Sequence, residues 1–95
     1  MKESELEQKF RQQVEKEGAK VLKFVSPGLA GVPDRMILTY GAKTYFAEIK
    51  RPGQHLRPLQ VYRKKQLEEL GYKVFVIDSV AAISNFIKFM KEGGS

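Results

Sequence analysis

An aspartate, a glutamate and a lysine stand at the open end of a short apolar hairpin in the middle of the chain: Asp34, Glu48 and Lys50. Residues two apart in a strand point to the same face, so Glu48 and Lys50 project together. Two carboxylates at one place repel each other unless a cation lies between them, and their oxygens favour Mg²⁺ or Mn²⁺. A lysine beside such an ion can hold a water or offset the charge of a phosphate. These residue types indicate phosphodiester hydrolysis.

The length of the hairpin loop decides whether the two carboxylates can meet. A two-residue turn at Gly41–Ala42 would turn Asp34 away from Glu48, because opposite residues share a face. A three-residue loop, Tyr40–Ala42, closing with a bulge would instead set the two carboxylates opposite each other. Alternatively, Asp34 could lie in the bend before the strand, which Pro33 favours because proline cannot donate to a ladder. The site needs either the odd loop or that bend.

The net charge of +6 is concentrated in one segment of the chain. Between residues 49 and 67 there is no acid, and the basic residues are Lys50, Arg51, Arg57, Arg63, Lys64 and Lys65. The remaining basic residues balance the 11 acidic ones. A confined basic patch indicates a polyanion such as nucleic acid, although a solvated helix face has the same pattern. The only histidine, His55, lies in the loop at 51–58 and would be either exposed or a phosphate contact.

Apolar spacing and chain breakers predict the element order αβββαβα. The first helix has one apolar face and should end at Gly18, with Ser4 and Glu7 as a capping box. Strands are expected at 20–25, 35–40, 44–50 and 73–78, and a second helix from Pro58 to about Leu70. The third and fourth strands should pair in parallel across that helix. The expected architecture is a small mixed sheet flanked by helices.

The last helix, capped by Asp78 or Ser79, carries two adjacent apolar stripes. The first should face the sheet and consists of Val80, Ile83, Ile87 and Met90; the second consists of Ala82, Phe86 and Phe89. A small domain has little core left for two more phenylalanines, so the second stripe predicts a homodimer that uses Phe86 or Phe89. The alternative is a broad buried face on this helix.

The composition fits one domain, residues 1–92, followed by a flexible tail at 93–95. The chain has no cysteine, which excludes disulfides and cysteine-based zinc sites. Its charged amino terminus shows no signal peptide, and no apolar run is long enough to span a bilayer. We therefore expect a soluble protein in the cytoplasm of a bacterial cell or a phage-infected host, without a membrane partner.

Three strings carry a resemblance to a known family: GVPDR at 31–35, FAEIKRPG at 46–53, and Gln60 at the start of the second helix. They resemble the virus-type replication–repair nuclease (VRR-NUC) branch of the PD-(D/E)XK nuclease superfamily, over about residues 3–87. The superfamily's restriction-endonuclease-like core has the order αβββαβ, as expected above. Some relatives have Q-x-x-x-Y on the second helix. Here Lys64 stands at that place, so no role is transferred to a tyrosine.

The resemblance implies a set of roles for the site residues. Asp34, Glu48 and the carbonyl of Ile49 would ligate Mg²⁺ or Mn²⁺, Lys50 would position and activate the water, and Gln60 would support the site. A first-helix glutamate would complete it. Of the two candidates we favour Glu7 over Glu3, because it lies one turn before the inward-facing Phe10, although capping alone explains it equally well.

Members of this branch act on branched or flapped DNA, and short stand-alone forms look like dimeric junction resolvases. The resemblance therefore implies a metal-dependent, structure-selective DNA endonuclease that cuts four-way (Holliday) junctions or flaps during DNA repair. Two other functions fit the charge pattern: a non-catalytic nucleic-acid-binding module of the same fold, and an RNA-cleaving enzyme of related fold. A pure binder gains little from acids beside a phosphate groove, which favours the enzyme.

Overall fold

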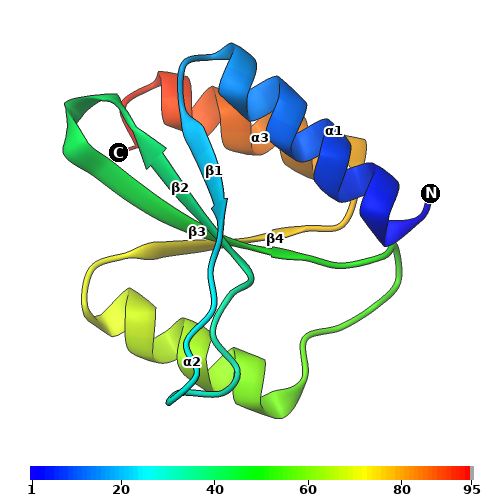
Figure 1. Cartoon of the computed structure of the whole chain (residues 1–95), viewed down its shortest axis with the longest axis vertical. Helices are drawn as coiled ribbons and strands as arrows, with labels where there is room; N and C mark the ends of the chain where they lie inside the picture. The colour runs from blue at the N-terminus through cyan, green and yellow to red at the C-terminus, as the bar shows by residue number, and fades with distance from the viewer. Residues whose placement is uncertain (95) are drawn as a thin grey trace.

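The computed structural model describes residues 1–94, and its elements follow the expected order (Figure 1). The helices are α1 (Glu3–Lys16), α2 (Pro58–Glu69) and α3 (Val80–Lys91). The strands are β1 (Lys20–Lys23), β2 (Arg35–Thr39), β3 (Lys43–Ile49) and β4 (Lys73–Ile77), with a 3₁₀ turn at Tyr40–Ala42. The mixed α/β class is confirmed.

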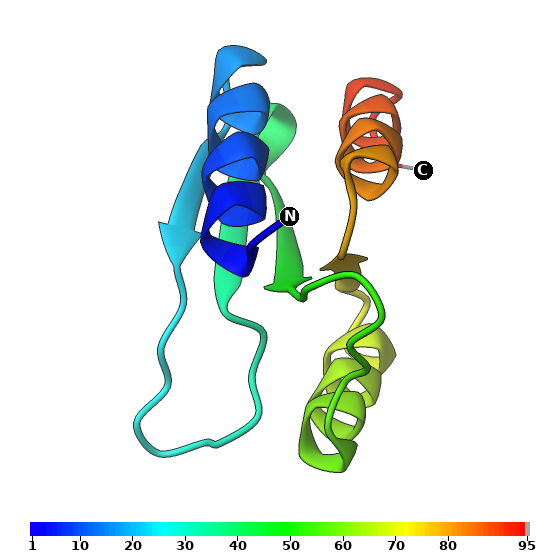
Figure 2. The same ribbon diagram turned by 90° about the vertical axis from the view of Figure 1, so that its right-hand side faces the viewer.

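The strands form one sheet in the order β1-β2-β3-β4. The first three are antiparallel neighbours, and β4 pairs with β3 in parallel after the crossover through α2. Helices α1 and α3 cover one face of the sheet, while α2 and the β1–β2 loop lie on the other side (Figures 1 and 2). The two faces therefore have different neighbours.

The apolar core lies between the sheet and the α1/α3 pair. Its aromatic centre is Phe86, 1% exposed, whose ring lies 5.4 Å from that of Phe10 and 4.8 Å from that of Phe75. The core also contains Leu6, Val14, Ala19, Val21, Ile37, Tyr45, Ala47, Ile49, Ile77, Ile83 and Met90. Burial of these side chains provides most of the hydrophobic stabilisation.

The predicted dimer surface on α3 is wrong. Phe86 is buried, and Phe89 packs against the rings of Tyr45 and Phe75 at 5.8 and 5.2 Å. Of the stripe expected to face the sheet, Val80 is instead 40% exposed. Helix α3 buries a broad face, the alternative considered above, because β3 and β4 both offer aromatic side chains to it.

The face under α2 is only partly covered. Phe46 is buried there, with the rings of Phe24 and Tyr72 5.4 and 5.5 Å away. Nearer the sheet edge, Leu22 and Leu38 remain 43% and 40% exposed. None of the residues of α2 itself, Pro58–Glu69, is buried. This helix rests on the sheet without entering a core.

The ends of the helices correct one expectation and confirm two. Helix α1 begins after Lys2 without a side-chain cap, so the predicted Ser4–Glu7 capping box does not form. Gly18, at φ +94°, follows the end of α1 as expected, and Ser79 caps α3 by accepting from the Ala82 amide at 3.1 Å.

Gly93 and Gly94 of the expected tail donate their amides to carbonyls at the end of α3, and Ser95 lies outside the described residues. Within residues 1–94, no helix is long and apolar enough to cross a membrane.

Candidate active site

The hairpin between β2 and β3 sets Asp34 level with Glu48. Thr39 pairs with Lys43 across three loop residues, and the ladder continues to Arg35 opposite Ala47. The odd loop is possible because Gly41 and Ala42 both adopt positive φ, +74° and +58°. The next step along the register brings Asp34 and Glu48 to the same face of the sheet. Both of the alternatives considered for Asp34 are present: the hairpin loop has three residues, and Asp34 itself lies in the bend before β2.

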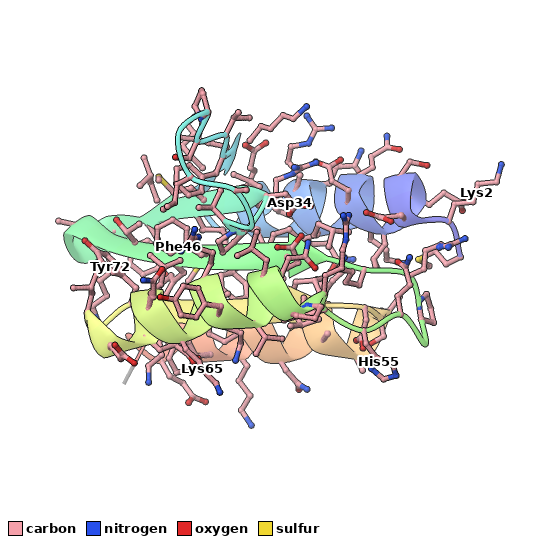
Figure 3. The ribbon with its side chains drawn as sticks, turned by 90° about the horizontal axis from the view of Figure 1, so that it is seen from below. Lys2, Asp34, Phe46, His55, Lys65 and Tyr72 are labelled. Carbon is pink, nitrogen blue, oxygen red and sulfur yellow. The ribbon has the colours of Figure 1, made fainter. Side chains whose placement is uncertain are left out.

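A cleft of about 430 Å³ gathers the predicted chemistry. Asp34 lines it from the bend before β2, and Glu48 and Lys50 line it from the end of β3; Figure 3 shows Asp34 beside the β1–β2 loop. The other lining residues are Glu3 from α1, Ala30, Gly31 and Val32 from the loop, and Arg57, Leu59 and Gln60 around the start of α2. Four segments that are distant in sequence therefore meet at this cleft.

Glu48 is held by Gln60. The carboxylate is only 5% exposed, and Gln60 Nε2 donates to its Oε1 at 3.3 Å. The other end of the Gln60 amide accepts from the Arg57 backbone at 2.9 Å, which satisfies a free N–H at the start of α2. Burial, followed by the nearby charge of Asp34, raises the pKa of Glu48 to about 7. Gln60 thus joins the beginning of α2 to a buried acid.

Asp34 and Lys50 complete the cleft floor. The Asp34 carboxylate accepts from the Ile49 amide at 3.3 Å. Burial raises the pKa of Asp34, and the neighbouring Arg35 guanidinium opposes that shift. Lys50 is only 7% exposed, which is rare for a lysine. Buried charges of this kind are costly without partners, which makes the trio a functional-site candidate.

The two glutamates of α1 have different surroundings. Glu7 Oε1 accepts from Arg35 Nε at 3.4 Å and lies 3.5 Å from Arg11 Nε. Glu3 instead lines the cleft, where its charge raises the pKa values of both Asp34 and Glu48. Sequence spacing could not separate them, because residues four apart share a helix face. Arg35, directly after Asp34, was the available signal that Glu7 has a partner.

The donor set fits a hard divalent cation. Among residues 1–94, no group of three or more His, Cys, Asp or Glu side chains lies close enough to hold a metal ion together. Glu48 is nevertheless buried and Asp34 is half-buried, desolvation raises the pKa of both carboxyl groups, and the charge of Asp34 raises the pKa of Glu48 further. A cation between them would relieve both effects, and oxygen ligands with several waters suit Mg²⁺ or Mn²⁺.

The basic segment divides into exposed and engaged side chains. Arg51, His55, Arg57 and Lys65 are exposed, and Figure 3 shows Lys65 on the side of α2 away from the β1–β2 loop. Lys64 pairs with Glu68 at 3.2 Å, and Arg63 donates to the Ala30 carbonyl at 2.7 Å. The positive charges therefore do not all face one surface.

Comparison with known proteins agrees with the fold. "Putative nuclease p44" of Acyrthosiphon pisum secondary endosymbiont phage 1 is 39% identical over 79 residues, which is 83% of this chain and 85% of that protein. A solved structure described as a "VRR_NUC domain" superposes with a TM-score of 0.85 at 23% identity, covering 90% of this chain and 94% of the other. No family model matches the sequence.

The site and the fold define a PD-(D/E)XK-type domain with its two acids and its lysine in one cleft. The identity to the phage protein and the shared fold place the chain in the VRR-NUC family.

Proposed function

We propose that this chain is a metal-dependent endonuclease that hydrolyses phosphodiester bonds in branched DNA, such as four-way junctions or flaps. The observation that carries the proposal is the convergence of Asp34, Glu48 and Lys50 in one cleft. The family supports nuclease activity, because the phage relative is named a nuclease and the matching structure a VRR-NUC domain. A role in DNA repair, in the cytoplasm of a bacterial cell or phage-infected host, fits such an activity.

Mg²⁺ or Mn²⁺ would be held by Asp34, Glu48 and the Ile49 carbonyl, and when bound it supplies Lewis-acid stabilisation of the charge that develops on the phosphate. Lys50 orients the attacking water and offsets negative charge beside it. Gln60 keeps the Glu48 carboxylate in one orientation through its 3.3 Å hydrogen bond. The protein thus acts mainly by positioning and electrostatics.

The first-helix carboxylate of this site is better assigned to Glu3 than to Glu7. Glu3 lines the cleft, whereas the Glu7 carboxylate is paired with Arg35 and Arg11. Glu7 ties α1 to the start of β2 through Arg35, and it shares a neighbouring cavity with Glu3, Asp34 and Ile49. Glu3→Gln should lower cleavage more than Glu7→Gln at limiting Mg²⁺, as measured by initial cleavage rates.

Contacts to DNA phosphates are proposed for the exposed cations near the cleft, Arg51, His55, Arg57 and Lys65, and for Lys64 after release from Glu68. Arg57 lines the cleft beside the carboxylates, whereas Lys65 lies on the side of α2 away from the β1–β2 loop. Such contacts position a duplex without reading its sequence. This agrees with selection of a DNA structure rather than a base sequence.

A homodimer remains part of the proposal, with a different surface from the one on α3. Leu22 and Leu38 lie on the same face of β1 and β2, and both stay more than a third exposed. A two-fold pair of domains would offer two cleavage sites to a symmetric junction. Sedimentation at high micromolar concentration should show a dimer that Leu22→Glu/Leu38→Glu dissociates; a monomeric wild type contradicts it.

A labelled substrate panel tests the activity. Four-way junctions, flaps, forks, linear duplex and RNA are incubated with Mg²⁺, with Mn²⁺, or with chelator. We expect the branched DNA substrates to be cleaved, and we expect this cleavage to require Mg²⁺ or Mn²⁺. Metal-dependent cleavage restricted to RNA would support the related RNA-cleaving enzyme. Tight DNA binding without cleavage of any substrate would support the non-catalytic binding module.

A further inference from the structure

Arg63 makes a bridge between α2 and the β1–β2 loop, residues 24–34. Its Nε donates to the Ala30 carbonyl at 2.7 Å, across 33 positions of sequence. Its Nη1 donates to Gln66 Oε1 at 2.8 Å, and the guanidinium carbon lies 5.2 Å from the centre of the Tyr62 ring. The planar donor fork is thereby fixed in orientation. Two of its donor directions are used inside the protein.

A second contact lies one helical turn before Arg63. A Cβ placed on Gly31 would come within 2.6 Å of Leu59 Cγ and 3.0 Å of the Leu59 carbonyl, and Gly31 has a φ of +84°. Only glycine allows the loop to approach α2 this closely in that backbone conformation. The loop and the helix are therefore joined at two successive points.

These contacts lie between two cavities. On one side is the catalytic cleft, whose walls are Ala30, Gly31 and Val32 from the loop and Leu59 and Gln60 from α2. On the other side is an apolar groove of about 370 Å³, lined by Leu29 and Val32 from the loop and by Arg63, Leu67 and Leu70 from α2, with Phe24, Ser26, Gln66 and Glu69. The Arg63 bridge thus fixes how far apart the two walls of the cleft stand.

Helix α2 depends on such contacts to an unusual degree, because no residue of Pro58–Glu69 is buried. The hydrogen bond between Gln60 and Glu48 links α2 to the sheet, and the hydrogen bond between Arg63 and Ala30 links it to the β1–β2 loop. If the Arg63 link is lost, the loop that leads directly into Asp34 and the helix that carries Gln60 can separate. Both carboxylates would then lose a defined position.

We propose that Arg63 is a positioning residue of the cleft, which holds the loop wall to the helix wall, rather than a contact to DNA phosphate. The expected effect on the cleavage rate rests on the proposed nuclease function. The bridge between Arg63 and the loop can be tested in the protein without DNA. Lys65 is the matched comparison, since it carries the same charge two residues further along α2 and is exposed.

The test compares Arg63→Gln with Lys65→Gln in the full chain. For Arg63→Gln we expect faster amide hydrogen exchange confined to residues 24–34 and α2, and a single-turnover cleavage rate lower by about tenfold, the size of one lost charge-assisted hydrogen bond. Its log–log salt slope of DNA binding should not change. For Lys65→Gln we expect unchanged exchange and a salt slope reduced by about 0.9.

Arg63→Lys should give an intermediate result, because one ammonium cannot reproduce the two directed donors. Gly31→Ala perturbs the same bridge from the loop side, and it should raise exchange in the same segments, with an effect less than additive when combined with Arg63→Gln. If Arg63→Gln proves too unstable to study, Gly31→Ala gives the exchange measurement alone.

The proposal is overturned if Arg63→Gln reduces the salt slope by about 0.9 while exchange in the loop stays at the wild-type rate, since that is the behaviour of a phosphate contact. It is equally overturned if neither variant of the bridge changes exchange. Failure of the wild type to cleave any DNA would reject the nuclease function, and the exchange result would still decide the bridge.

Discussion

The two faces of the sheet are built in different ways. On the α1/α3 face, apolar side chains interlock, and Phe10, Ile37 and Ile83 are each 0% exposed. On the α2 face, Glu48 and Lys50 are buried, no residue of α2 is buried, and hydrogen bonds link Gln60 to Glu48 and Arg63 to Ala30. The first face has the character of a core and the second that of a site.

This difference indicates a division of labour within a chain of 95 residues. Stability comes from the face that carries no candidate chemistry, so the other face can hold buried charges that cost folding energy. Contacts that are few and polar also allow local opening at lower free energy than the core. The candidate cleft therefore lies on the face that is attached by fewer apolar contacts.

The largest expected contrast is in stability. Phe86→Ala should lower the free energy of unfolding by about 3–5 kcal/mol, because it leaves a cavity among packed aromatic rings. Leu67→Ala, on the half-buried side of α2, should cost about 1 kcal/mol. Urea unfolding followed by circular dichroism gives both values. Similar losses in the two variants would show that α2 shares a common core with α3.

A smaller effect concerns pH in the absence of metal ions. Glu48 has a folded pKa of about 7 against an ordinary value of 4.5, so between these values the folded state binds more protons than the unfolded state. Stability should therefore fall as pH rises from 4.5 through 7, by roughly 3 kcal/mol. Asp34, whose pKa is also raised, acts in the same direction.

Unfolding experiments at several pH values, in chelator and in Mg²⁺, measure this effect. Glu48→Gln should flatten the profile, and saturating Mg²⁺ should reverse the loss at pH 8. Glu69→Gln, which changes an exposed glutamate of α2, is the control and should keep the wild-type profile. A wild-type protein whose metal-free stability rises over this interval would contradict the assigned environment of Glu48.

The smallest expected effect is on the salt dependence of DNA binding. Arg57→Gln, at the mouth of the cleft, should reduce the log–log slope by about 0.9, as for one lost duplex phosphate contact. Lys88→Gln removes an exposed charge from α3, on the other face, and should leave the slope unchanged. Equal changes in the two variants would mean that DNA does not select the α2 face.

The sequence predicted that Asp34, Glu48 and Lys50 would converge, but it did not predict the packing of α3. The requirement that Asp34 reach the face of Glu48 left two possibilities, an odd hairpin loop or a bend before the strand, and the structure has both. The burial of Phe86 did not follow, because it depends on Tyr45 and Phe75 from other strands. The sequence favoured Glu7 over Glu3, and the contact that argues for Glu3 instead is the pairing of Glu7 with Arg35, which joins two distant segments. Local geometry is encoded nearby in sequence, whereas these contacts join distant segments.

Cleavage and binding measured on the same variants test the central claim most directly. Asp34→Ala and Lys50→Ala are compared with the wild type on a labelled four-way junction in Mg²⁺ or Mn²⁺, with binding measured separately in Ca²⁺. The account predicts that both variants lose cleavage by several orders of magnitude while their affinity for the junction stays within about threefold of the wild type. Cleavage that persists in both variants, or is lost only in proportion to affinity, would contradict a catalytic role for the cleft.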